Sequence, residues 1–164
     1  MIDLDIMRGP GEWARVAGLE GLAQRAIEAA FAVAPEAPSS PVELSLLLSD
    51  DAGVRELNRA WRGLDKPTNV LSFPGSGAPT PDGVHHLGDI ALAFETVARE
   101  AEAEGKSLAD HVAHLIVHGV LHLTGLDHET DEEADAMEAL ETAALASLGI
   151  ADPYRDMAGL NVEA

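Results

Sequence analysis

The spacing of apolar residues along the chain predicts a mixture of helices and strands. Residues 12–33 place Val16, Leu19, Leu22 and their apolar neighbours at helical intervals, which indicates one long amphipathic helix. Residues 42–48 first alternate apolar and polar side chains and then become mostly leucine, as is typical of a strand buried on at least one face. The same patterns predict strands at 3–7, 69–73 and 87–94, helices at 50–61, 95–104 and 130–148, and a glycine- and proline-rich mobile loop at 74–86.

Capping residues define two helices in the second half of the chain. Ser107 precedes a helix, with Asp110 three residues later in capping-box position, and Gly125 can end that helix in a left-handed turn. Thr130 and Glu133 repeat the capping pattern at the start of the last helix. Because helices and strands mix without regular alternation, we expect an α+β fold in which a small mixed β-sheet is packed with helices.

The composition limits the class of protein. The chain has 164 residues, which we expect to form one domain over residues 1–164, and it has no cysteine, which excludes disulfides and thiolate zinc sites. The first residues lack the basic start of a secretory signal, and no apolar run approaches the roughly 20 residues that span a bilayer. We therefore expect a cytoplasmic protein without a membrane partner. Its formal charge of −19 argues against tight nonspecific nucleic-acid binding, and we expect no DNA partner.

Three histidines form the most informative motif. His118, His122 and His128 have the spacing H-x3-H-x5-H, with Gly125 between the second and the third. Two histidines four residues apart on a helix lie on one face, and a left-handed turn at Gly125 can bring the third to the same point. Three neutral imidazoles suit zinc at roughly 2.0–2.1 Å and leave a fourth position for water. The spacing therefore predicts one Zn²⁺ ion in a catalytic site.

Gly119 distinguishes this motif from that of a protease. The three histidines and Gly125 match the H-E-x-x-H-x-x-G-x-x-H pattern of metzincin proteases. Gly119 stands where those proteases carry the glutamate that deprotonates the metal-bound water. Without that general base a protease is disfavoured, although we still expect a metzincin-like zinc helix in the core of the fold.

Basic residues gather in one short segment. Arg55, Arg59, Arg62 and Lys66 are four of the ten basic residues, at spacings of four, three and four. They would form one cationic stripe if the helix predicted at 50–61 ran that far. Such a stripe is either a solvated helix face or a surface for an anionic substrate.

Several blocks of the sequence carry a family resemblance. His118 to His128 reads H-G-V-L-H-L-T-G-L-D-H, residues 57–73 form a second block, and residues 87–90 read L-G-D-I. Over about residues 42–155, including the regions 137–141 and 152–154, the chain resembles the YbeY family of bacterial ribosomal RNA maturation factors and endoribonucleases. Leu126 departs from the family pattern, which usually has tyrosine there.

This resemblance implies a single-strand-specific metallo-endoribonuclease that acts in 3′-end maturation of small-subunit (16S) rRNA and in ribosome quality control. It implies one Zn²⁺ ion bound by His118, His122 and His128, and a functional arginine that maps onto Arg62. The implied partners are single-stranded rRNA and ribosomal components. Arg62 would hold the phosphoryl oxygens as charge develops on them, with Arg59 and Lys66 steering the RNA backbone. An accessible single strand would suit a cleft without obvious base-reading aromatic residues.

Three further residues have two interpretations each. His114 lies one turn before His118 on the predicted helix. It either supports a ligand histidine or is simply a half-buried polar residue. Asp89 either orients a ligand histidine or belongs to the structure of its strand end. Asp127 either fixes the ring of His128 through a carboxylate contact or forms a turn.

Two rival functions remain open at this point. A non-enzymatic zinc-containing ribosome assembly factor would suit the acidic charge, although a structural zinc site usually has four protein ligands rather than the three found here. The other rival is a zinc hydrolase acting on a small phosphoester or amide. The number of protein ligands at the metal separates the assembly factor from either hydrolase.

Overall fold

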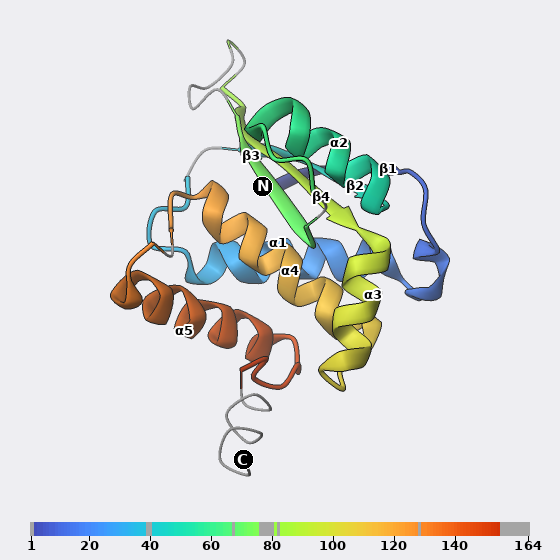
Figure 1. Cartoon of the computed structure of the whole chain (residues 1–164). Helices are drawn as coiled ribbons and strands as arrows, with labels where there is room; N and C mark the ends of the chain where they lie inside the picture. The colour runs from blue at the N-terminus through green and yellow to red at the C-terminus, as the bar shows by residue number, and fades with distance from the viewer. Residues whose placement is uncertain are drawn as a thin grey trace.

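Four strands of the chain form one mixed sheet. The computed structural model describes residues 2–38, 41–66, 68–75, 81, 83–127 and 129–154. The strand order is β1-β2-β4-β3, in which β1 and β4 run parallel to β2 and β3 runs antiparallel to β4 (Figure 1). The strands are β1 (Ile2–Arg8), β2 (Val42–Ser49), β3 (Val70–Pro74) and β4 (His85–Ala93). The predicted small mixed sheet is thereby confirmed.

Helices cover both faces of this sheet (Figure 1). The described residues form a short 3-10 helix (Trp13–Arg15) and the helices α1 (Leu19–Val33), α2 (Asp51–Arg62), α3 (Phe94–Ala103), α4 (Leu108–Leu123) and α5 (Asp131–Ser147). Helix α4 packs against α1, α3, α5 and the sheet on one side, while α2 covers β4 on the other. This arrangement confirms the α+β class. Within the described residues, no helix combines the length and apolar character needed to cross a membrane.

The first predicted helix starts later than expected. Gly18 adopts a left-handed backbone (φ 64°) directly before α1, so the helix cannot extend back to residue 12. The residues before it contain the 3-10 turn, which places Trp13 in the core. The Trp13 indole donates to the Ser49 carbonyl (3.1 Å) and packs edge-on against Phe94. The burial of Trp13 in the core thus takes the place of the first turns of the predicted helix.

The strand predicted at 87–94 starts earlier than expected. His85 and His86, predicted to lie in the mobile loop, already belong to β4. The amide of His85 donates to the Pro41 carbonyl (2.8 Å), which joins this end of β4 to the start of β2. Most of the rest of the predicted loop, residues 76–80 and 82, lies outside the described residues.

Helix α4 is the buried centre of the fold. Its N-terminus is capped as predicted, because the Ser107 hydroxyl accepts a hydrogen bond from the Asp110 amide (3.1 Å). Gly119 lies against the sheet: a Cβ atom there would come within 3.0 Å of Ile90 Cδ1 and 3.1 Å of Ser72 Oγ. The absence of a side chain at Gly119 therefore lets α4 approach β3 and β4 closely. This contact fixes the helix turn that carries His118 and His122.

Candidate active site

His118 and His122 point at each other from successive turns of α4. Their Nε2 atoms are 3.1 Å apart. The Nδ1 of His118 donates to Glu141 Oε2 (2.9 Å) and the Nδ1 of His122 donates to the Leu126 carbonyl (3.0 Å). Since a carboxylate and a carbonyl only accept, these contacts place the ring protons on Nδ1 and leave both Nε2 lone pairs facing one another.

This geometry fits a bound cation. Two unprotonated nitrogens at 3.1 Å repel each other unless a positive charge lies between them. Two nitrogen ligands of a tetrahedral zinc ion at about 2.0–2.1 Å lie about 3.3 Å apart, close to the spacing of His118 and His122. The donor set of two imidazoles, each held from behind by an acceptor, is the arrangement that zinc sites use.

The predicted third ligand, His128, lies outside the described residues. Within the described part of the chain, no group of three His, Asp or Glu side chains gathers to hold a metal. The turn that leads toward His128 has the predicted form, because Gly125 takes a positive φ of 105° and its amide donates to the His122 carbonyl (3.0 Å). Leu126 supports His122 through its backbone carbonyl, so this contact does not depend on the side chain in which the chain departs from the family pattern.

Glu141 is a site residue that the sequence analysis missed. Its side chain is 1% exposed and accepts hydrogen bonds from His114 Nε2 (2.5 Å), His118 Nδ1 (2.9 Å) and the Tyr154 hydroxyl (2.6 Å). Burial alone would raise its pKa, but the hydrogen bonds from His114, His118 and Tyr154 outweigh burial and lower the pKa to about 2. Glu141 is therefore a buried carboxylate that stays charged behind His118.

A pattern in α5 could have revealed Glu141. Met137, Glu141, Ala144 and Leu145 are the buried residues of this helix, so one acid stands in an otherwise apolar stripe. A buried carboxylate needs partners, and the histidines of α4 supply them. His114, one of the residues with two interpretations, supports the site indirectly: it is buried and contacts Glu141 rather than His118. Burial, followed by hydrogen bonding to Glu141, raises the pKa of Tyr154.

Arg62 shares a cleft with the two histidines. The cleft has a volume of about 570 Å³ and is lined by Arg62, His118, His122, Asp127 and residues of β3. Arg62 is the last residue of α2, and Gly63 ends the helix in a left-handed conformation (φ 71°). The Arg62 guanidinium donates to the Ser72 carbonyl (2.8 Å) and lies 5.6 Å from the centre of the Phe73 ring. The structure thus brings the predicted catalytic arginine to the histidine pair.

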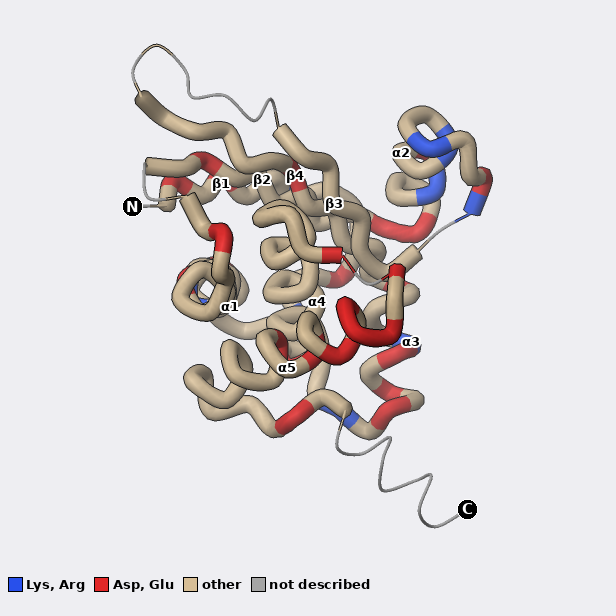
Figure 2. The backbone as a smooth tube through the Cα atoms, turned by 90° about the vertical axis from the view of Figure 1, so that its left-hand side faces the viewer, with Lys and Arg blue, Asp and Glu red and all other residues tan. Residues whose placement is uncertain are grey.

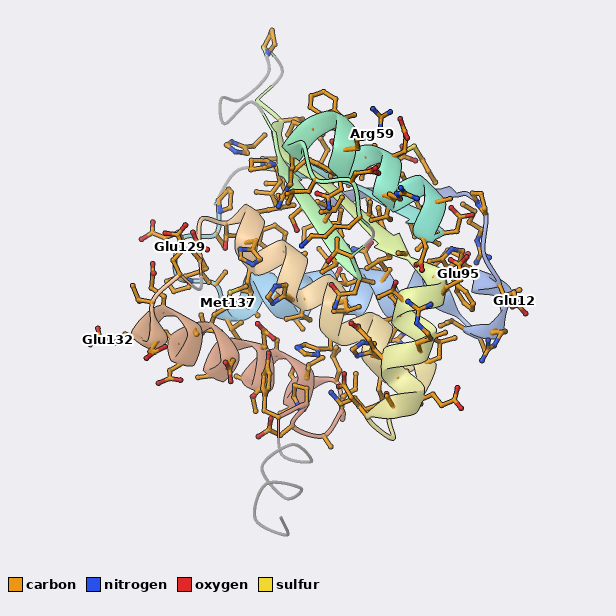
Figure 3. The ribbon with its side chains drawn as sticks, viewed as in Figure 1. Glu12, Arg59, Glu95, Glu129, Glu132 and Met137 are labelled. Atoms are coloured by element: carbon orange, nitrogen blue, oxygen red, sulfur yellow. The ribbon has the colours of Figure 1, made fainter. Side chains whose placement is uncertain are left out.

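Arg59 and Lys66 do not line this cleft. Arg59 forms an ion pair with Glu56 and is directed away from α4 on the outer side of α2 (Figure 3). Lys66 follows the end of α2, so the condition for a continuous helical stripe fails at Gly63. The Lys66 carbonyl instead accepts a hydrogen bond from the buried Asn58 (3.0 Å), which holds the loop after the helix. The two residues predicted to steer the RNA backbone therefore lie outside the cleft that contains the histidine pair.

Asp89 and Asp127 have different positions relative to the histidines. Asp127 lies in the lining of the cleft. Asp89 lies on the same face of β4 as Ala91 and Ala93, which pack in the apolar cluster under α2. Asp89 therefore lies on the opposite face of the sheet from α4, and the structure does not bring it together with His118 and His122.

Comparisons with known proteins identify relatives of this chain. Residues 14–149 match the family described as endoribonuclease YbeY. An endoribonuclease YbeY of Rhodopseudomonas palustris (strain BisA53) is 55% identical over 147 residues, which cover 88% of this chain and 85% of the relative. One of Rhodospirillum rubrum is 54% identical over 165 residues, which cover 95% of this chain and 82% of the relative.

A solved structure supports the fold. The solution structure of a Thermotoga maritima protein superposes with a TM-score of 0.55 at 24% identity, over 90% of this chain and 91% of that one. The sequence matches extend across the cleft, because they include α2, β3, β4 and α4 together. The chain belongs to the endoribonuclease YbeY family.

Proposed function

We propose that this protein is a zinc-dependent endoribonuclease that cuts single-stranded RNA in the cytoplasm. Its proposed substrate is the 3′ region of small-subunit (16S) rRNA, in maturation and in ribosome quality control, in association with ribosomal components. The observation that carries the proposal is the cleft in which Arg62 faces two imidazoles with convergent Nε2 atoms. The names of the relatives, all endoribonucleases, support RNA as the substrate class.

The chain's own residues have distinct proposed roles. His118, His122 and His128 would hold one zinc ion, and the metal would supply an activated water and polarise a phosphoryl oxygen. Glu141 and the Leu126 carbonyl orient the first two rings from behind. Arg62, fixed by the Ser72 carbonyl, presents further N–H donors to nonbridging phosphoryl oxygens. Gly119 carries no carboxylate, so peptide hydrolysis stays disfavoured.

A cleavage assay on single-stranded RNA tests this proposal. We expect wild-type protein to cut the RNA, and both His122→Ala and chelator-treated protein to lose the activity, because each removes the metal. Elemental analysis of the same preparations should find zinc in the wild type alone. Equal cleavage by all three samples would identify a contaminating nuclease and refute the enzymatic claim. Four protein ligands at the metal would favour the assembly-factor alternative.

Arg62→Ala separates metal binding from catalysis. The variant should keep zinc, since Arg62 contacts Ser72 and Phe73 rather than the imidazoles. It should lose most cleavage, by about 100-fold or more, as when a preorganised donor to a developing charge is removed. Arg59→Ala is the matched control from the same helix, and it should stay near wild type because Arg59 does not line the cleft. Loss of zinc in Arg62→Ala would contradict this role.

A further inference from the structure

A second groove adjoins the cleft on the α2 face of the sheet. It has a volume of about 600 Å³ and shares Arg62, Ser72 and Pro74 with the lining of the cleft. Its other walls are mostly apolar, from Met7 of β1, Leu57 and Trp61 of α2 and Phe73 of β3. A chain that passes Arg62 can therefore run from the cleft directly into this groove.

Trp61 stands out on the rim of the groove. Its side chain is 74% exposed, whereas the other tryptophan, Trp13, is 2% exposed in the core. The Trp61 ring lies 6.4 Å from Phe73, with the planes tilted by 56°, and the Arg62 guanidinium lies over the same Phe73. An exposed indole beside an arginine offers a flat stacking surface next to a phosphate-binding group.

The basic residues of the chain are concentrated near Trp61. The chain as a whole carries −19, yet three of its ten basic residues, Arg55, Arg59 and Arg62, lie on α2 together with Trp61. Figure 2 shows Lys and Arg gathered at α2 and the segment after it, while Asp and Glu dominate α3 and the start of α5. Arg55 and Arg59 are ion-paired with Asp65 and Glu56, whereas Arg62 lines both the cleft and the groove. A strand of negative charge therefore meets a guanidinium directly beside the exposed indole.

We infer that Trp61 and the groove behind it bind an unstacked base of single-stranded RNA that continues from the cleft. This inference rests on the proposed function for the path of the strand. Arg62 then contacts the backbone between the two subsites, and the indole stacks on the base. Base–aromatic stacking tolerates any sequence, because every base has a π face. The groove would thus extend the footprint on RNA without reading its sequence.

Binding of a modified RNA, shown by electrophoresis to stay intact during the titration, tests the inference on the zinc-loaded full chain. The probe is a 2′-O-methyl single strand of about 12 nucleotides, within the usual range for single-strand sites. Trp61→Ala should weaken binding about tenfold, while Trp61→Phe should retain most of the affinity because it keeps an aromatic face. Leu64→Ala is the matched control: Leu64 is also exposed (47%) but does not line the groove, so its binding should equal wild type.

A strand with abasic sites isolates stacking from charge. Wild type and Trp61→Ala should bind the abasic strand equally, and only the strand with bases should quench the emission of Trp61 while buried Trp13 continues to emit. Equal affinity of wild type and Trp61→Ala for the strand with bases would overturn the inference. So would loss of binding to a ribosomal protein with RNA binding unchanged, which would assign the groove to a protein partner.

The two proposals fail separately. Trp61-dependent binding by a protein that cuts no RNA would refute the nuclease and leave this groove as an RNA site. Cleavage with no effect of Trp61 on affinity would refute the groove and leave the nuclease.

Discussion

Glu141 sets the orientation and the tautomer of the His118 ring. The carboxylate accepts the Nδ1 proton of His118, which directs Nε2 toward His122. Partners of this kind behind a ligand histidine typically contribute 10- to 100-fold in metal affinity. We expect Glu141→Gln to weaken zinc binding by about this factor, because a neutral amide is a poorer acceptor for the His118 ring proton. Competition with a chelator of known zinc affinity measures the change.

The same helix supplies a control for Glu141. Glu132→Gln removes the same charge at an exposed position in the first turn of α5, where the side chain points away from α4 (Figure 3). Its zinc affinity should equal that of wild type. If Glu141→Gln also binds zinc as tightly as wild type, the carboxylate supports the fold but does not position His118.

At the scale of elements, the packing of α4 on the sheet depends on Gly119. A side chain there would meet Ile90 and Ser72 at van der Waals limits or closer. Gly119→Glu restores the residue that the metzincin pattern has, but a Cβ atom there would already come within 3.0 Å of Ile90 Cδ1 and 3.1 Å of Ser72 Oγ. We expect it to lower the free energy of unfolding by about 1–3 kcal/mol or more, because the side chain fits only if α4 or the sheet moves. Chemical denaturation measures the loss.

A matched glutamate tests whether packing causes that loss. Ala139→Glu adds the same side chain at an exposed position of α5 and should change the free energy of unfolding by less than about 0.5 kcal/mol. Comparable stability of Gly119→Glu and Ala139→Glu would show that α4 can move away from the sheet. In that case the Gly119 contact does not fix the position of His118.

Patterns local to one element predicted more of this protein than contacts between elements did. The capped start of α4 and the left-handed turn at Gly125 follow from residues a few positions apart, and both were confirmed. The partnership of Glu141 with His118 joins two helices, and no spacing along the chain encodes it. The two interpretations of Asp89 could not be separated for a related reason, since the sequence does not show which face of β4 is covered by α4.

The net charge of the whole molecule has the same sign as its proposed substrate, RNA, but the fold places most acidic residues away from the cleft. Acidic residues outnumber basic ones by 29 to 10, yet α2 places arginine on the side of the cleft opposite the histidines. Much of the excess of acid lies on α3 and at the start of α5, so RNA that enters the cleft meets the guanidinium of Arg62 in spite of the net charge. Folding, rather than composition, therefore decides which polyanion-binding functions this chain can have.

The stability of the metal-free protein in acid tests whether Glu141 is charged in the folded protein. The pKa of Glu141 falls from 4.5 to about 2 on folding, so its stabilising contribution is complete above pH 4.5 and is lost as the pH falls toward 2. Over the same range, below the pI of about 4.4, protonation of the surface acids makes the protein increasingly positive, and this repulsion lowers the stability of wild type and variant alike. Wild type should therefore exceed Glu141→Gln in free energy of unfolding at pH 7, by at most about 3 kcal/mol, and the difference should vanish near pH 2. Urea denaturation across this range measures it, and a difference independent of pH would show that Glu141 is not charged in the folded protein.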